Sequence, residues 1–158
     1  MRVFKCILSI LLCFCVLVSC TSKNELSAKD IAEGLKSLSA STISWIELDK
    51  SKISTYFGFT DEKISDFKGY INSAEENFDM IAVFKFEDNE VREDIMKGIG
   101  TMTQQMSETY NLANKSISDK INSHIIAERD GTVILCIMEA NEKVSSFITE
   151  DVGAKVIN

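Results

Sequence analysis

Residues 125–137 have the sequence IIAERDGTVILCI, and they predict the β-hairpin around which the fold is built. Asp130-Gly131 is a residue pair that a two-residue type I′ turn favours, because both positions need a positive φ. Such a turn sets the register of the two strands. The predicted pairs are Arg129 with Thr132, Glu128 with Val133, Ala127 with Ile134, Ile126 with Leu135, Ile125 with Cys136 and His124 with Ile137.

Two strands of this sheet are predicted to lie in its interior. Residues 81–86 (IAVFKF) and 132–138 (TVILCIM) are apolar on both alternating faces, which is typical of strands covered on both sides. Between them lies a single apolar stripe at helical spacing, which predicts one helix of about five turns. Its members are Val91, Ile95, Ile99, Met102, Met106 and Tyr110.

Shorter elements flank this centre. Ser27, with Asp30 three positions on, predicts the start of a helix over Ala28 to Leu38. Asp49 is expected to cap a short helix that ends near Gly58, residues 67–71 are expected to be extended, and a closing helix is expected from Glu142 to Ile148. Residues 43–48 do not distinguish strand from loop. This order predicts an α+β fold, with helices packed on an antiparallel-rich sheet.

The amino end predicts export and lipid attachment. Arg2 and Lys5 precede an apolar run from Ile7 to Val18, which is too short to span a bilayer and suits a signal peptide. Leu17-Val18-Ser19-Cys20 resembles a bacterial lipobox, which implies cleavage between Ser19 and Cys20 and a diacylglyceryl group on the Cys20 sulfur. An uncleaved membrane helix and an ordinary secretory signal are the alternatives.

The predicted organisation therefore has three parts. Residues 1–19 form a lipoprotein signal peptide, residues 20–26 hold the lipidated cysteine and a short tether, and residues 27–158 form a single α+β domain. Removing the leader takes away two of the 17 basic residues and none of the 24 acidic ones. The mature chain is thus strongly acidic, which argues against nucleic acid as a partner and leaves the lipid as the only predicted contact with the membrane.

The residues most often used in catalysis give weak signals. His124 is the only histidine, and its neighbour Ser123 points to the opposite face if both lie on a strand, so we expect a structural histidine. Cys136 lies among apolar residues, which predicts a buried and unreactive thiol. Gly98-Ile99-Gly100 lies within the helical stripe, where small residues usually allow close packing. No catalytic or cofactor-binding residue is assigned.

Two clusters have some binding capacity. An acidic group crowds the start of the long helix, where oxygen ligands for a cation such as calcium are dense, although a solvated helix start is the preferred interpretation. Its members are Glu87, Asp88, Asn89, Glu90, Glu93 and Asp94. The methionines Met96, Met102 and Met106 are typical of an adaptable groove but more often fill a core. No metal ligand is assigned.

Several blocks together resemble a known family. The blocks are residues 55–59 (TYFGF), residues 80–86 (MIAVFKF), the long helix ending at Tyr110, and residues 131–135 (GTVIL). From about Leu48 to Ile148 the chain resembles the bacterial lipoprotein domain catalogued as domain of unknown function 4358. This resemblance implies a lipid-anchored domain of Gram-positive, clostridia-like bacteria with no established activity, so it supplies no catalytic residues.

Two functional hypotheses follow. The first is a non-enzymatic binding module at the outer face of the cytoplasmic membrane, which recognises a protein of the cell envelope or a small ligand through the sheet or the long helix. The second is a carboxylate-dependent hydrolase that acts on cell-envelope material. Two carboxylates about 5 to 10 Å apart in a concave pocket favour the enzyme, whereas a convex acidic surface favours the module.

Overall fold

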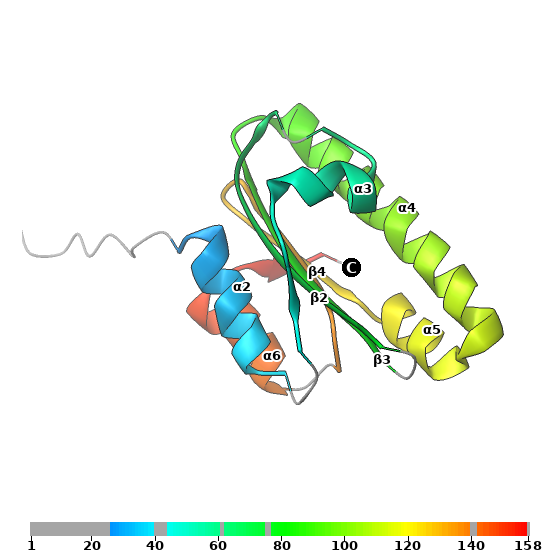
Figure 1. The fold of residues 1–158 in the computed structure, drawn as a ribbon. Coiled ribbons are helices and arrows are strands. Elements are labelled where there is room, and N and C mark those ends of the chain that lie inside the picture. The colour runs from blue at the N-terminus through cyan, green and yellow to red at the C-terminus, as the bar shows by residue number, and fades with distance from the viewer. Residues whose placement is uncertain (1–25, 40–43, 61, 75–76, 140–141, 158) are drawn as a thin grey trace, which may run out of the picture.

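The computed structural model describes residues 26–39, 44–60, 62–74, 77–139 and 142–157. These residues form one α+β domain around a sheet of six antiparallel strands in the order β1-β2-β3-β5-β4-β6 (Figure 1). The predicted fold class is confirmed. The strands are β1 (Ile46–Leu48), β2 (Ile64–Ala74), β3 (Asn77–Phe86), β4 (Ile125–Arg129), β5 (Thr132–Ile137) and β6 (Lys155–Val156).

Helices cover both faces of the sheet (Figure 1). On one face lie α3 (Ile53–Phe57), which follows the 3₁₀ turn η1 (Lys50–Lys52), and then α4 (Asn89–Ala113) and α5 (Lys115–Asn122). On the other face lie α2 (Ala28–Ser37), α6 (Glu142–Ser146) and the π-helical turn η2 (Phe147–Asp151). The sheet thus separates two apolar cores.

The predicted hairpin is confirmed in turn and register. Five of the six predicted pairs between β4 and β5 are present. The sixth, His124 with Ile137, is not formed as a strand pair, because β4 begins only at Ile125. Asp130 and Gly131 have φ values of 39° and 73°, as a type I′ turn needs. A Cβ on Gly131 would lie 2.6 Å from the carbonyl oxygen of Phe86, so only glycine fits where the turn crosses the end of β3.

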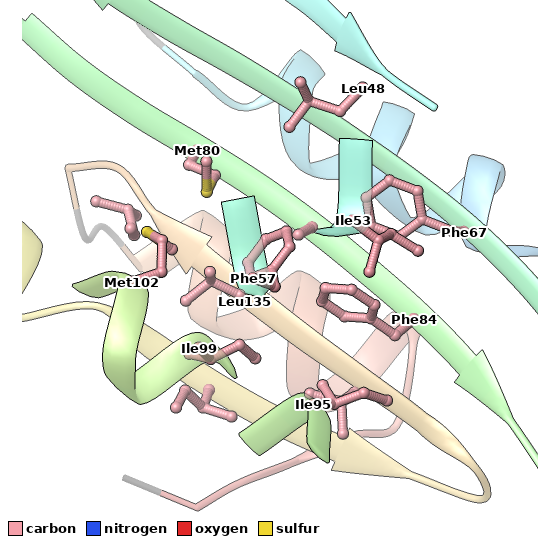
Figure 2. Close-up of a cluster of buried hydrophobic side chains, with 14 of the residues drawn as sticks. Leu48, Ile53, Phe57, Phe67, Met80, Phe84, Ile95, Ile99, Met102 and Leu135 are labelled. Atoms are coloured by element: carbon pink, nitrogen blue, oxygen red, sulfur yellow. The ribbon is translucent and has the colours of Figure 1, made fainter. Parts of the chain in front are cut away.

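The larger core lies between the sheet and α3, α4 and α5 (Figure 2). Phe84 is fully buried at its centre, with ring centroids 5.0 Å from both Phe57 and Phe67. Figure 2 shows Ile95, Ile99 and Met102 of α4 reaching into the same cluster, as the stripe predicted.

The smaller core lies beneath α2 and α6. Helix α2 begins at the predicted position, because Ser27 and Asp30 form a capping box. Fully or nearly fully buried side chains of α2, α6 and η2 contact the sheet here: Ala28, Ile31, Ala32, Leu35, Val144 and Ile148.

The structure corrects several predicted bounds. The segment expected over residues 67–71 is an eleven-residue strand from Ile64 to Ala74. The closing helix ends at Ser146 and continues as the π-helical turn η2. Helix α5 and strand β6 were not predicted, because each is short and depends on contacts with distant residues. Residues 46–48, left undecided from sequence, form β1.

Both edge strands are short. β1 pairs with β2 over residues 46–48, and β6 pairs with β4 through Lys155 and Val156. Glu47 of β1 forms an ion pair with Lys68 of β2, which places charge beside this edge. Ile46 is 60% exposed. Each edge strand therefore presents few of its own backbone groups to a further strand.

The two glycines of α4 provide a matched test of packing. A Cβ on Gly98 would lie 2.5 Å from the carbonyl oxygen of Phe57, whereas a Cβ on Gly100 would meet open space. We expect Gly98→Ala to lower the free energy of unfolding by more than about 1 kcal/mol through a forced shift of α3. Gly100→Ala should raise it by about 0.5–1 kcal/mol, because alanine favours a helix interior. Urea unfolding followed by far-UV circular dichroism measures both; equal effects of the two substitutions would contradict this packing.

Candidate functional site

A polar cleft lies at the end of the sheet where the amino end of the described chain joins the domain. We call it the N-terminal cleft; its volume is about 450 Å³ and it opens to solvent. Its lining residues are Ser27, Ser65, Asp66, Lys85, Phe86, Glu87, Asp130 and Gly131. A second open hollow of about 420 Å³ adjoins it and shares Ser65 and Glu87. This end of the sheet therefore has a concave surface that carries both signs of charge.

Strands β2 and β3 position the charged groups of the cleft. Ile64 pairs with Phe86 and Asp66 pairs with Lys85, so Ser65 is an extra residue that forms a bulge in β2. Bulges redirect neighbouring side chains and are common beside functional sites. Phe86 donates its backbone N–H to the carbonyl oxygen of Gly131 at 2.8 Å, which holds the β4–β5 turn against the end of β3.

The central charges of the cleft contact the start of the domain. Lys85 Nζ donates to the carbonyl oxygen of Leu26 at 3.2 Å. Asp66 Oδ2 accepts a hydrogen bond from the backbone N–H of Ala28 at 2.9 Å. Neither interaction is visible from sequence, because residues about 38 and 59 positions apart must first be brought together. The only sign of these interactions in the sequence was Lys85, a charged residue near the end of an apolar strand.

The carboxylates of the cleft bear on the hydrolase hypothesis. Asp66, Glu87 and Asp130 line one concave surface, which is the kind of arrangement that paired-carboxylate chemistry uses. Asp66 already accepts a hydrogen bond from Ala28, and Asp130 forms an ion pair with Arg129 at 3.2 Å. Two of the three carboxylates in the cleft, those of Asp66 and Asp130, therefore already interact with other groups of the protein.

A buried ion pair lies at the opposite end of β3. Lys120 Nζ lies 2.8 Å from Asp79 Oδ1 and also donates to the side chain of Asn77, whose amide nitrogen in turn donates to Asp79 at 2.7 Å. The side chain of Asp79 is 5% exposed. Removing either partner would leave the other charge buried, so this cluster ties α5 to the sheet. Sequence analysis missed it, although an aspartate inside residues 77–86 was a signal.

Cys136 is buried, as expected, and His124 contacts the backbone just before β4. The Nδ1 atom of His124 lies 2.8 Å from the carbonyl oxygen of Ile121, and the hydroxyl of Ser123 donates to the carbonyl oxygen of Lys120, so the two side chains do not form a catalytic pair with each other. Cys136 is 2% exposed, and burial raises the pKa of its thiol to about 12, with a smaller contribution from the charge of Asp79. A thiol with this pKa is a poor nucleophile near neutral pH.

The acidic cluster and the methionine cluster predicted from the sequence lie in different parts of the fold. Asp88 caps α4 by accepting a hydrogen bond from the N–H of Glu90, and Glu87 lines the cleft. Across the described ranges, no group of three or more histidine, cysteine, aspartate or glutamate side chains is placed to hold a metal ion. Met102 is buried in the larger core, and Met96 and Met106 pack against it. Gly98 allows close packing, as expected, but Gly100 does not.

The structure does not describe the predicted lipid site. Cys20 and Ser19, together with the rest of residues 1–25, lie outside the described residues. The first described residue is Leu26, and it is the residue whose carbonyl oxygen Lys85 contacts.

A two-pronged ion pair joins α4 to β4. Arg92 donates from Nε and Nη2 to the two carboxylate oxygens of Glu128, at 2.8 and 2.9 Å. These hydrogen bonds hold the pKa of Glu128 below its ordinary value. A lowered pKa in the folded state means that the pair stabilises the fold above the unfolded pKa of glutamate, about 4.3, and that this contribution is lost as the pH falls through the lowered value.

We therefore expect a pH-dependent effect of Arg92→Gln. The substitution should lower the free energy of unfolding at neutral pH, and the difference from the wild type should shrink in acid as Glu128 takes up a proton. Urea unfolding at a series of pH values measures this difference. Lys63→Gln is the control, because its 3.5 Å pair with Glu90 is exposed and should contribute little. A difference that stays constant across the acidic range would contradict the assignment.

Comparisons with known proteins identify the family and no close relative. The chain matched neither a curated protein nor a solved structure. The family described as Domain of unknown function (DUF4358) matches residues 39–138, a stretch that starts and ends earlier than the resemblance over Leu48 to Ile148. This match contains β1 to β5 with α3, α4 and α5. Because it covers well over half of the 158 residues, the chain belongs to this family of domains of unknown function.

Proposed function

We propose that this protein is a lipid-anchored, extracytoplasmic binding module, held at the outer face of the cytoplasmic membrane by acyl chains on Cys20. The sequence Leu17-Val18-Ser19-Cys20, after a basic start and a short apolar run, is the observation that carries the proposal. Ser19 and Cys20 flank the cleavage site, and two acyl chains on one cysteine suffice for stable anchoring without a basic surface.

Two further observations are compatible with this placement. A capped helix begins at Ala28, seven residues after Thr21, so the folded domain starts close to the lipid site. Within the ranges that the structure describes, no helix is both long enough and apolar enough to cross a bilayer.

The outer face of α4 is the best-supported surface for a protein partner from the cell envelope. Helices cover both faces of the sheet, so the sheet itself offers mainly its edges. Helix α4 has 25 residues; the exposed side of its first half is largely charged, whereas that of its second half is mostly neutral and polar and includes one 92% exposed leucine, Leu112. Its exposed residues include Thr101, Gln104, Gln105, Glu108 and Thr109. A mixed polar surface of this kind suits a non-obligate interface better than a nucleic acid.

The lipid anchor predicts a specific labelling result. Cys20→Ala should abolish incorporation of a radioactive fatty acid and leave the protein unprocessed or outside the membrane fraction, because no other sulfur stands at the cleavage site. Cys15→Ala is the matched control, since it removes a cysteine within the leader and should leave labelling intact. Label retained by Cys20→Ala would overturn the anchor proposal.

The binding role predicts position-specific crosslinking in intact cells. A photo-crosslinking residue at Gln105, on the exposed side of α4, should trap a discrete envelope protein, identified by mass spectrometry, in the anchored form. The same residue at Lys143, on α6, should not trap it, and neither should a secreted form with a replaced lipobox. Identical products from both positions, or no product from an abundant folded protein, would contradict a specific module.

A further inference from the structure

Three consecutive residues at the start of the domain are held in place by the sheet and by each other. Lys85 binds the carbonyl oxygen of Leu26, and Asp66 binds the N–H of Ala28. Between them, the hydroxyl of Ser27 accepts from the backbone N–H of Asp30 at 3.1 Å, and Asp30 Oδ2 accepts from the N–H of Ser27 at 3.1 Å. The first described residues are therefore held at a defined point of the domain.

Residues 26–28 lie at one end of the sheet. Lys85 and Asp66 are paired across β3 and β2, and they share the N-terminal cleft with Asp130 and Gly131 of the β4–β5 turn. Figure 1 shows the start of α2 near this turn, whereas α5 and the start of β3 lie at the other end. We call the end with the cleft the proximal end and the end with α5 the distal end.

The length of the tether limits how the domain can sit on a membrane. Five residues lie between Cys20 and Leu26, and the six Cα–Cα steps from Cys20 to Leu26 span at most about 20 Å when fully extended. Strand β3 has ten residues and is therefore about 33 Å long. A lipid on Cys20 cannot let the distal end face the bilayer while the proximal end points away, because the tether is shorter than the sheet.

We propose that Lys85 and Asp66 act as an orientation clasp, which turns the proximal end toward a phospholipid bilayer and the distal end away from it. This inference rests on the lipid anchor proposed above. A tether attached to a freely rotating first residue would allow many tilts, but the clasp fixes residues 26–28 to two interior strands of the sheet, β2 and β3. The outer face of α4 then runs from the bilayer at Asn89 to the distal end at Ala113.

The charge of the proximal end favours a neutral phospholipid surface. The two hollows at this end are lined by the carboxylates Glu62, Asp66, Glu87, Asp88 and Asp130 and by only two lysines, Lys63 and Lys85. An anionic leaflet should repel this end at low salt, and added salt should screen that repulsion. Vesicles of phosphatidylcholine are therefore the appropriate probe for orientation.

The test uses the lipidated full-length protein, isolated from membranes and reconstituted into phosphatidylcholine vesicles. Nitroxide labels are attached at Glu62→Cys on the proximal end and, in a separate protein, at Asn122→Cys at the end of α5. Cys136 is buried and Cys20 carries the lipid, so each protein takes one label. Collision with a nickel chelate on the lipid headgroups should be several-fold more frequent for the label at position 62 than for the label at position 122.

The clasp is tested by the double substitution Lys85→Met with Asp66→Asn. It should leave vesicle flotation intact and clearly reduce the difference between the two collision frequencies, because residues 26 and 27 then add to the length of the tether. The double substitution Lys63→Met with Asp130→Asn is the matched control, because it makes the same charge changes at the same end without touching residues 26–28. It should preserve the several-fold difference. Circular dichroism checks that all four labelled proteins with double substitutions are folded.

The outcomes separate this inference from the anchor on which it rests. Wild-type protein that fails to float with vesicles would overturn both proposals. Wild-type protein that floats but shows equal collision frequencies at the two labels would overturn the orientation and leave the anchor standing. A difference that is undiminished by loss of Lys85 and Asp66 would overturn the role of the clasp.

Discussion

The burial of β3 and β5 on both faces is the constraint on which the rest of the structure depends. Every side chain of β5 is buried, and along β3 only Asn77 and Lys85 are partly exposed. A strand pair with two apolar faces needs a helical layer on each side. Helices α3, α4 and α5 supply one layer, and α2 with α6 supplies the other. Lys85 interrupts this burial one residue before the end of β3, and it lines the polar cleft beside the buried Phe86.

Features with local signals could be predicted from the sequence. The hairpin register followed from Asp130-Gly131, because turn geometry is set by adjacent residues, and α4 followed from a stripe that repeats along one helix. Helix α5 has only two buried isoleucines, Ile117 and Ile121, and its other supports come from far away in sequence: the hydroxyl contact of Ser118 with Ser107 and the ion pair of Lys120 with Asp79. Strand β6 likewise depends on pairing with β4.

The candidate site shows the same division between local and long-range signals. Glu87 was noted as part of an acidic group and Asp130 as a turn residue, but nothing in sequence placed them beside Asp66 and Lys85. The family match covers only part of the described domain, because α2 and α6 lie outside residues 39–138. The helical layer nearest the amino end of the domain is therefore formed by α2, which precedes the matched stretch, and by α6, which follows it. The two helices cover the same face of the sheet.

The short edge strands have a consequence for how many copies of the protein can share one membrane. Lipid anchoring of the kind proposed confines molecules to a plane, where their lateral concentration is high and two sheets meet side by side. A long exposed edge would then recruit neighbours through backbone pairing. β1 and β6 offer three and two residues to such contacts. Glu47 with its ion-pair partner Lys68 places charge beside β1, and Lys155 places charge on β6. Edge strands this short would limit backbone pairing between neighbouring copies in such a plane.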